Sequence, residues 1–377
     1  MSPPEPRRVL IANLTMAAAS GTVLYTRDLA LALLRRGWTP VVYTSVLGPE
    51  ATALRAATIP VVTDPAQLGA APDVIHGHHI LETLAAMSRF PGVPAVFVCH
   101  DALAWHSIPP RLRRIRAYIA VDRNCRDRMV LEHGIPEESV RVLTNPVDLH
   151  RFSQREPLPA RPRRALVFSN QAHESFVGPI REACKERSIE VDVIGTAAGH
   201  SVEEPEHLLP NYDLVFGKAR CAIEAAAAGC AVIVSDLRGM AGLLTMEGLE
   251  EMRVLNFGAR TLQRPVTKEN VLRELDRYDP EEAARVSRYV RQANDADLLA
   301  EQFADLYEEI LGEPLRESAH EDLAGISAAL VAVNPQIHAQ ADAAQALVQP
   351  LRRLLDAPLI GRPLRLVYRF NRWVWSR

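Results

Sequence analysis

Short apolar runs alternate with amphipathic stretches along most of the chain. The apolar runs are rich in valine, isoleucine and leucine, which is typical of strands buried on both faces. They lie at residues 9–12, 41–43, 95–99, 118–122, 140–143, 165–169 and 191–194. The stretches between them have the helical period, as in residues 23–36, where the pattern places Leu29 and Leu33 on one face and Arg27 on another. Strands that alternate with helices in this way predict an α/β fold with parallel sheets.

Residues 212–236, YDLVFGKARCAIEAAAAGCAVIVSD, hold the clearest strand–helix–strand pattern. We expect strands at 214–216 and 231–234, with a helix at 221–228 between them. The crossover makes the two strands parallel neighbours. The loop between the first strand and the helix then lies beyond the carboxyl end of a strand, where open α/β sheets bind ligands.

That loop consists of Gly217, Lys218, Ala219 and Arg220. Free amides at the start of a helix attract anions, and Lys218 and Arg220 add positive charge beside them. Glu224, one turn into the helix, can point back toward a ligand held at the loop. The pattern therefore predicts a site for a phosphate-bearing ligand.

This stretch resembles the nucleotide-sugar segment of glycosyltransferase family 4 (GT4), whose members are retaining enzymes with the two-domain GT-B fold. In the family, two glutamates separated by seven residues open this helix, and the second binds the ribose of the donor. Glu224 matches the second glutamate, while Phe216 stands where the first contacts the donor sugar. The resemblance implies a nucleotide-diphospho-sugar donor, a glycan or lipid-linked acceptor, and no metal or other cofactor. Lys218 would assist departure of the diphosphate.

A second resemblance to GT4 lies at residues 140–152, where TNPVDLHRF is similar to the family's hinge sequence, with Pro146 in place of a glycine. The Pro- and Arg-rich segment that follows reads as an exposed linker. We therefore expect two Rossmann-like domains with parallel sheets facing a cleft. Residues 1–154 form the acceptor domain, and residues 155–312 form the donor domain, whose last helix crosses back. Residues 313–377 form a helical extension.

Polar side chains follow two strands of the first domain. His76, His78 and His79 come at the end of one strand, and His100 and Asp101 end the strand at 95–99. The tips of adjacent parallel strands converge on one edge of a sheet. Histidines at such places also serve simply as packing and hydrogen-bonding groups, and their spacing, without an acidic partner, does not predict a metal site.

In GT4 a histidine that follows the strand corresponding to residues 95–99 lies beside the reacting sugar. His100 matches this histidine, which implies a catalytic role for His100. The same resemblance places His78, His79 and Asp101 on the acceptor or sugar side. Gly21 matches a glycine of the family's first loop, which faces the donor diphosphate. The loop of the second domain that usually supplies an arginine and a lysine reads NQAHES here, residues 170–175, so we expect Lys218 and Arg220 to supply that charge.

Composition places the chain among globular proteins that do not bind nucleic acid. The 377 residues are 48% hydrophobic and 24% charged, with a net charge of −3. Five scattered cysteines fit a reducing compartment, and the amino terminus has no apolar signal segment. We therefore expect a cytoplasmic protein. P-loop, G-x-S-x-G, CxxC and HExxH motifs do not occur in the sequence.

The carboxyl-terminal region leaves two interpretations open. Residues 318–355 have the pattern of one or two amphipathic helices, and residues 356–377 mix arginine with aromatic and aliphatic side chains. Such a segment suits peripheral contact with the inner face of a membrane, or packing on the body or on a partner. Two other functions also remain open: another GT-B activity such as a sugar-nucleotide epimerase, and a non-catalytic subunit that kept the fold.

Overall fold

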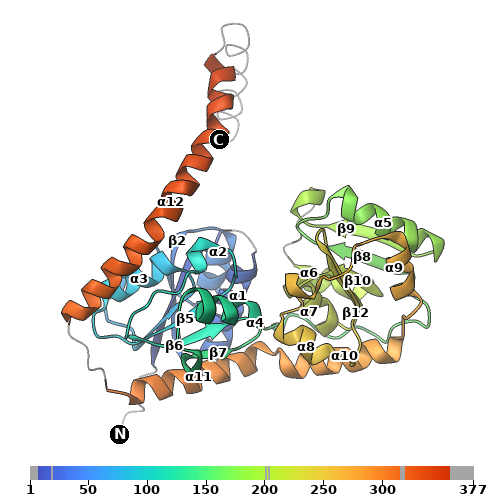
Figure 1. Ribbon diagram of the computed structural model, residues 1–377. Helices are drawn as coiled ribbons and strands as arrows, with labels where there is room; N and C mark the ends of the chain where they lie inside the picture. Colours follow the sequence, from blue (N-terminus) through green and yellow to red (C-terminus); the bar gives the residue numbers. More distant parts are fainter. Residues whose placement is uncertain (1–6, 18–19, 200–201, 203, 315–318, 357–377) are drawn as a thin grey trace. The chain divides into compact units, whose positions relative to one another are not determined.

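The computed structural model describes residues 7–17, 20–199, 202, 204–314 and 319–356 (Figure 1). The chain divides into two compact units, residues 1–323 and 324–377. The basic aromatic segment predicted to contact a membrane lies outside the described residues beyond Asp356.

Seven parallel strands form the first sheet, in the order β3-β2-β1-β4-β5-β6-β7. They are β1 (Arg8–Thr15), β2 (Thr39–Val46), β3 (Val61–Val62), β4 (Val74–Gly77), β5 (Ala95–Cys99), β6 (Ile115–Ala120) and β7 (Val140–Val142). The sequence predicts all of these strands except β3, which is too short to carry a pattern: β4 is the strand that ends in histidines, and the other five carry apolar runs. The order reverses between β1 and β4, and in such sheets ligands bind outside the carboxyl ends of the strands at this point.

Helices α1 (Gly21–Arg35), α2 (Pro49–Ala56), α3 (Ile80–Arg89) and α4 (Arg123–Asp127) belong to this sheet. Two expectations need correction. Residues 125–134, which follow the predicted strand at 118–122, are expected to form a helix, but the structure has a short α4 followed by a π-helical turn, Arg128–Glu132, and α4 already starts at Arg123 because Asp122 caps it. Arg27 is only 8% exposed, because it forms ion pairs with Asp28 and Glu50.

The second sheet has five strands in the order β12-β11-β10-β8-β9. They are β8 (Arg164–Phe168), β9 (Glu190–Ile194), β10 (Leu214–Gly217), β11 (Ala231–Asp236) and β12 (Gly239–Leu243). Strands β8, β9, β10 and β11 are parallel, as predicted, whereas the edge strand β12 runs antiparallel to β11. The chain reverses because Asp236 Oδ1 accepts the backbone N–H of Arg238 at 2.6 Å, and Gly239 takes a φ of +152°.

Alternate residues of β10 pack into two separate cores. Val215 lies in a core with side chains of α7 (Arg220–Ala227) and α10 (Pro280–Ala293). Leu214 and Phe216 lie in a core with side chains of α5 (Glu174–Glu186) and α9 (Lys268–Leu275). The sheet is therefore covered by helices on both faces, as parallel strands require. Two shorter helices, α6 (Pro205–Leu208) and α8 (Leu249–Val254), complete this part.

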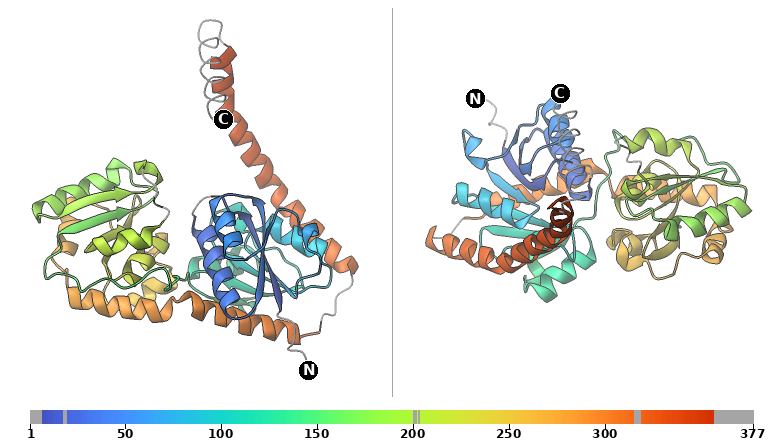
Figure 2. Two further views of the ribbon diagram at one scale, coloured as in Figure 1. Left: turned by 180° about the vertical axis from the view of Figure 1, so that it is seen from behind. Right: turned by 90° about the horizontal axis from the view of Figure 1, so that it is seen from above.

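Helix α11 (Ala296–Gly312) follows the second sheet in sequence but packs against α1 (Figures 1 and 2). Arg35 Nη2 and Asp297 Oδ1 are 2.7 Å apart, and the hydroxyl of Tyr307 lies 2.5 Å from His76 Nδ1 of β4. The first domain is thus completed by a late stretch of the chain. The boundaries at 154 and 312 stay a prediction.

A single helix, α12 (Ala319–Asp356), covers the region expected to form one or two helices. Its first turn carries Asp322, which pairs with the buried Arg114 at 2.5 Å. Among the described residues no helix is long and apolar enough to cross a bilayer.

Candidate functional site

The basic loop Gly217–Arg220 lies at the carboxyl end of β10, next to β8, where the order of the second sheet reverses. A Cβ on Gly217 would lie 3.1 Å from the carbonyl oxygen of Phe168, so a larger residue there would require the backbone of the two strands to move apart by a few tenths of an ångström. Ala219, the N-cap of α7, has a φ of +47° and a ψ of −126°, which residues with a Cβ rarely adopt. The loop is therefore a sharp, strained turn from strand to helix.

Replacing Ala219 with glycine is expected to stabilise the protein by about 1 kcal/mol, because glycine adopts this backbone conformation without steric cost. Urea denaturation of the two full-length proteins measures the difference. Ala228→Gly is the control, because Ala228 has an ordinary helical φ of −71° and should lose stability on the same change. Equal destabilisation by the two substitutions would contradict the presence of backbone strain at Ala219.

Arg220 joins the two domains through a buried ion pair. Its Nε donates to Glu224 Oε1 at 2.6 Å, and its Nη2 contacts Asp28 Oδ2 of α1. Arg220, Glu224 and Asp28 are 7%, 2% and 0% exposed. Burial opposes the charge on Arg220, but the two carboxylates outweigh it and raise its pKa. Burial also raises the pKa of Glu224, partly countered by Arg220. In the structure Nε and Nη2 of Arg220 are thus both paired with carboxylates.

Lys218 is paired as well, with Asp236 at the end of β11. Asp236 is fully buried, whereas the Lys218 side chain is 27% exposed. Phe216, at the position of the family's first glutamate, is fully buried in a core between sheet and helices, so it does not stand in for a sugar-binding carboxylate. Both cations of the loop already have carboxylate partners within the chain, and a diphosphate would have to compete for them.

The predicted convergence of strand tips brings two histidines together. His78 Nδ1 lies 2.7 Å from His100 Nε2, and the Tyr25 ring makes a T-shaped contact with each of the two imidazoles. His79 Nδ1 accepts the backbone N–H of Leu14 at 3.0 Å, which leaves the proton on Nε2. Burial lowers the pKa of His78 and His100 well below its usual value and lowers that of His79 to about 3. These groups are therefore neutral imidazoles at pH 7.

Asp101 and Gly21 occupy simpler positions. Asp101 Oδ1 accepts the backbone N–H groups of Leu103 and Ala104 at 2.6 and 2.8 Å, which closes a turn after β5. Gly21 is the first residue of α1, and a Cβ there would have no atom of the described residues within 4 Å. The packing of the chain thus does not require glycine at residue 21.

Sequence reasoning missed Asp28, Asp236 and Tyr25, which contact predicted site residues directly. Asp28 is adjacent to Arg27 in a helix whose other buried residues are mostly apolar, and a buried acid in such a helix is the one available signal. Across the described residues, no three histidine, cysteine, aspartate or glutamate side chains form a metal-binding group.

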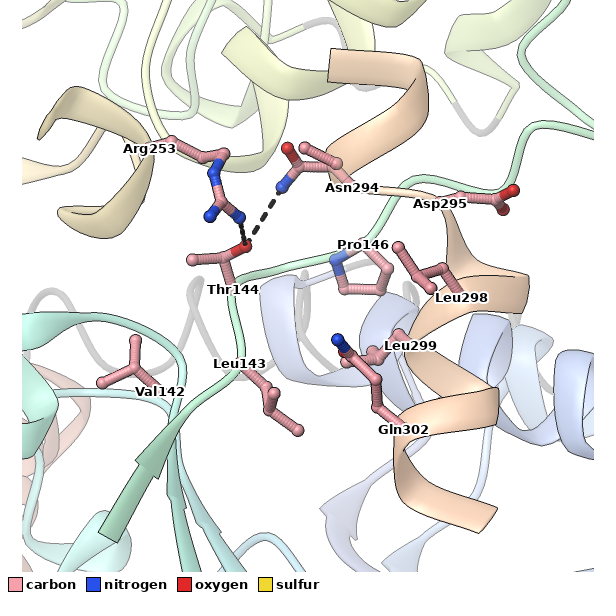
Figure 3. Close-up of a pocket in the computed structure, with 11 residues that line it drawn as sticks. Val142, Leu143, Thr144, Pro146, Arg253, Asn294, Asp295, Leu298, Leu299 and Gln302 are labelled. Atoms are coloured by element: carbon pink, nitrogen blue, oxygen red, sulfur yellow. Dashed lines mark hydrogen bonds between the residues drawn. The ribbon is translucent and has the colours of Figure 1, made fainter. Parts of the chain in front are cut away.

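A cavity of about 100 Å³ lies where the hinge meets α8 and the junction of α10 with α11 (Figure 3). Thr144 Oγ1 accepts from Arg253 Nη1 at 2.9 Å and from the Asn294 side-chain amide at 3.3 Å. Leu298 and Leu299 form part of the apolar wall. None of the predicted site residues lines this cavity. Its walls include the two segments that connect the domains, which are the hinge and the junction of α10 with α11.

Comparisons with known proteins agree with this architecture. Residues 65–151 match the family model of Glycosyltransferase Family 4. A glycosyltransferase from Rickettsia africae has 12% sequence identity and a TM-score of 0.56, over 82% of this chain and 100% of that one. Anabaena HepE in complex with UDP and glucose has 14% identity and a TM-score of 0.57, over 80% and 99%.

A putative UDP-N-acetylglucosamine 2-epimerase from Listeria monocytogenes is also similar, with 14% identity and a TM-score of 0.52, over 83% of this chain and 99% of that one. No curated protein sequence matches the chain. At identities this low, the structural similarity establishes the fold alone. The chain therefore has the GT-B fold of these glycosyltransferases, and its resemblance to glycosyltransferase family 4 is confirmed over residues 65–151.

Proposed function

We propose that the protein is a glycosyltransferase of the GT4 type, which moves a sugar from a nucleotide-diphospho-sugar to a glycan or lipid-linked acceptor with retention of configuration. The observation that carries the proposal is the position of Lys218, Arg220 and Glu224 on a strand-to-helix turn where the second sheet reverses its order, in a chain that folds like the UDP-bound HepE. Ligands bind at such reversal points in α/β sheets.

In this proposal the second domain holds the nucleotide, with Glu224 on the ribose. Lys218 leaves Asp236 to neutralise the departing diphosphate, and a charge-assisted hydrogen bond of this kind contributes about 1.5–3 kcal/mol. The neutral imidazole of His100 hydrogen-bonds a hydroxyl of the sugar or the acceptor, with His78 fixing its ring. No side chain acts as a nucleophile, so catalysis rests on positioning and charge stabilisation.

Two substitutions test the assignment. Glu224→Gln is expected to weaken binding of the cognate nucleoside diphosphate about tenfold, a loss of about 1.4 kcal/mol. Lys218→Ala is expected to slow transfer about 100-fold. A thermal-shift screen against UDP-, GDP- and ADP-sugars identifies the donor, and calorimetry measures the affinity for the nucleotide. The control is Lys185→Ala, because Lys185 is an exposed lysine of α5. Nucleotide affinity and turnover unchanged by both variants would refute the proposal.

An epimerase acting on a sugar nucleotide is the second candidate, favoured by the similarity to the putative epimerase from Listeria monocytogenes. It would use the same nucleotide site without an acceptor. Product analysis after incubation with the UDP-sugar alone separates the two activities. Nucleotide binding with no turnover on any donor and acceptor would instead indicate a non-catalytic subunit, which the buried Phe216 favours.

We further propose that the enzyme works in the cytoplasm on a cell-envelope glycan and that residues 356–377 contact anionic lipids at the inner face of the membrane. Basic and aromatic side chains together support such contact. Sedimentation of the full chain with anionic liposomes at low salt should exceed that of a chain ending at residue 355. Equal sedimentation would exclude a membrane role for these residues.

A further inference from the structure

Seven charged side chains form one connected network around Asp28. From the first domain Glu50 pairs with Arg27, and Arg27 with Asp28. Asp28 contacts Arg220, which holds Glu224, and it lies 3.9 Å from Arg151, which binds Glu206. Asp28 is fully buried, and the other six side chains are at most 21% exposed. The network is too buried to be an ordinary surface cluster.

Asp28 fixes the direction of the Arg220 side chain. The guanidinium group is planar, so contacts at Nη2 and Nε determine the orientation of the whole group. Glu224 accepts from Nε at 2.6 Å, and its carboxylate is therefore oriented through Arg220. An aspartate 192 residues earlier in the chain thus controls the side chain proposed to bind the ribose.

The third nitrogen of Arg220 indicates which part of a ligand belongs there. Nη1 is buried and has no hydrogen-bond partner among the described residues. A buried donor without a partner is unfavourable, so a bound ligand oxygen at Nη1 would be favourable. The network as a whole holds four carboxylates against three guanidinium groups, and this excess of negative charge favours a neutral hydroxyl over a phosphate oxygen. Arg220 accordingly belongs to the sugar end of the nucleotide, not to its diphosphate.

We infer that Asp28 is a positioning residue of the nucleotide site, which acts across the domains by holding Arg220 and, through it, Glu224 against a ribose hydroxyl. The inference rests on the proposed function in one respect, the identity of the ligand. It implies that the ribose-binding groups are fully ordered only while α1 lies against the start of α7. Nucleotide affinity therefore depends on a contact between the two domains.

The test compares Asp28→Asn with Glu50→Gln in the full chain. Both remove one carboxylate from the same network, but Glu50 contacts Arg27 and not Arg220. Calorimetry with UDP, GDP and ADP is expected to show about tenfold weaker binding of the cognate nucleotide for Asp28→Asn and less than twofold for Glu50→Gln. Asp28→Glu, which keeps the carboxylate, should recover most of the affinity. In an Arg220→Gln background, Asp28→Asn should add less than a twofold loss.

Hydrogen exchange of the ligand-free chain supplies an independent readout. Amides of residues 220–227 should exchange faster in Asp28→Asn than in the wild type or in Glu50→Gln, because Arg220 loses its anchor. Wild-type protein that binds none of the three nucleotides would defeat the proposed function, and exchange would then still decide the positioning role. Unchanged exchange in Asp28→Asn, unchanged affinity, or an equal loss in Glu50→Gln would each overturn the inference.

Discussion

Acidification from pH 7 to pH 5 is expected to destabilise the protein by several kcal/mol, because buried neutral histidines must gain a proton as it unfolds. His76, His78 and His79 are at most 2% exposed. Burial lowers the pKa of His76 and of His79 to about 3, and it lowers that of His78 well below its usual value. In the unfolded chain a histidine has a pKa of about 6.5, so between these values the unfolded state binds more protons. Stability therefore falls as the pH falls.

Each such histidine costs about 2 kcal/mol at pH 5, from a slope of about 1.4 kcal/mol per pH unit below 6.5. Four buried or half-buried carboxyl groups act in the opposite sense, because burial raises their pKa and they take up protons more readily in the fold. They are Glu82, Asp122, Asp148 and Glu224. The expected net loss is therefore smaller than the sum over the histidines.

Urea denaturation at pH 7.5, 6.5, 5.5 and 5.0 measures this loss. His79→Asn keeps an acceptor for the N–H of Leu14 but cannot be protonated, so the free energy of unfolding should fall by about 1.4 kcal/mol less per pH unit. His173→Gln replaces an exposed histidine and should leave the slope unchanged. A free energy of unfolding that is constant from pH 7 to pH 5 would contradict the buried neutral histidines.

Replacing Arg114 with alanine is expected to lower the free energy of unfolding by about 3–5 kcal/mol, the usual cost of breaking a buried ion pair. Arg114 is 2% exposed, and its guanidinium donates to the carbonyl oxygens of Met87, Phe90 and Val93 at 2.8, 3.1 and 2.8 Å. Its Nε lies 2.5 Å from Asp322. The substitution removes a donor from each of these acceptors near the end of α3, and the carbonyl oxygen of Phe90 keeps only the backbone N–H of Val93, at 3.3 Å.

The neighbouring Arg113 is a matched control. Its side chain is 76% exposed, and its nearest carboxylate, Glu321, lies 3.9 Å away. Arg113→Ala should therefore change the free energy of unfolding by less than about 0.5 kcal/mol. A loss below 1 kcal/mol for Arg114→Ala, measured by urea denaturation beside this control, would show that water replaces the guanidinium at no real cost.

Buried strands were the easiest part of the fold to predict, because a run of aliphatic residues between turns has few other uses. Two of the elements that were missed lack such a run. Strand β12 contains two glycines in five residues, and helix α3 begins directly after three histidines that read as a loop. In each case tertiary contacts decide the local structure, through the turn at Asp236 and the packing of α3 on β1 and β4.

For the site, the sequence indicated the positions but not the partners. Adjacent strand tips predict that His78 and His100 meet, and they do. The pairing of Arg220 with Asp28 could not be found in the same way, since no spacing rule connects residues 192 positions apart. Lys218 and Arg220 were expected to be available to bind a phosphate, whereas both are already paired with carboxylates. The roles of Lys218 and Arg220 in ligand binding can be assigned only when their carboxylate partners are known.

The dependence of the first sheet on α11 has a consequence for how the protein is made and dissected. A fragment ending near residue 154 lacks Tyr307 and Phe303, which pack against His76, and would leave that imidazole exposed. During synthesis the first sheet stays incompletely covered until the helix at 296–312 has been made. Isolated expression of the first domain should therefore require that helix to be fused to it or supplied as a peptide.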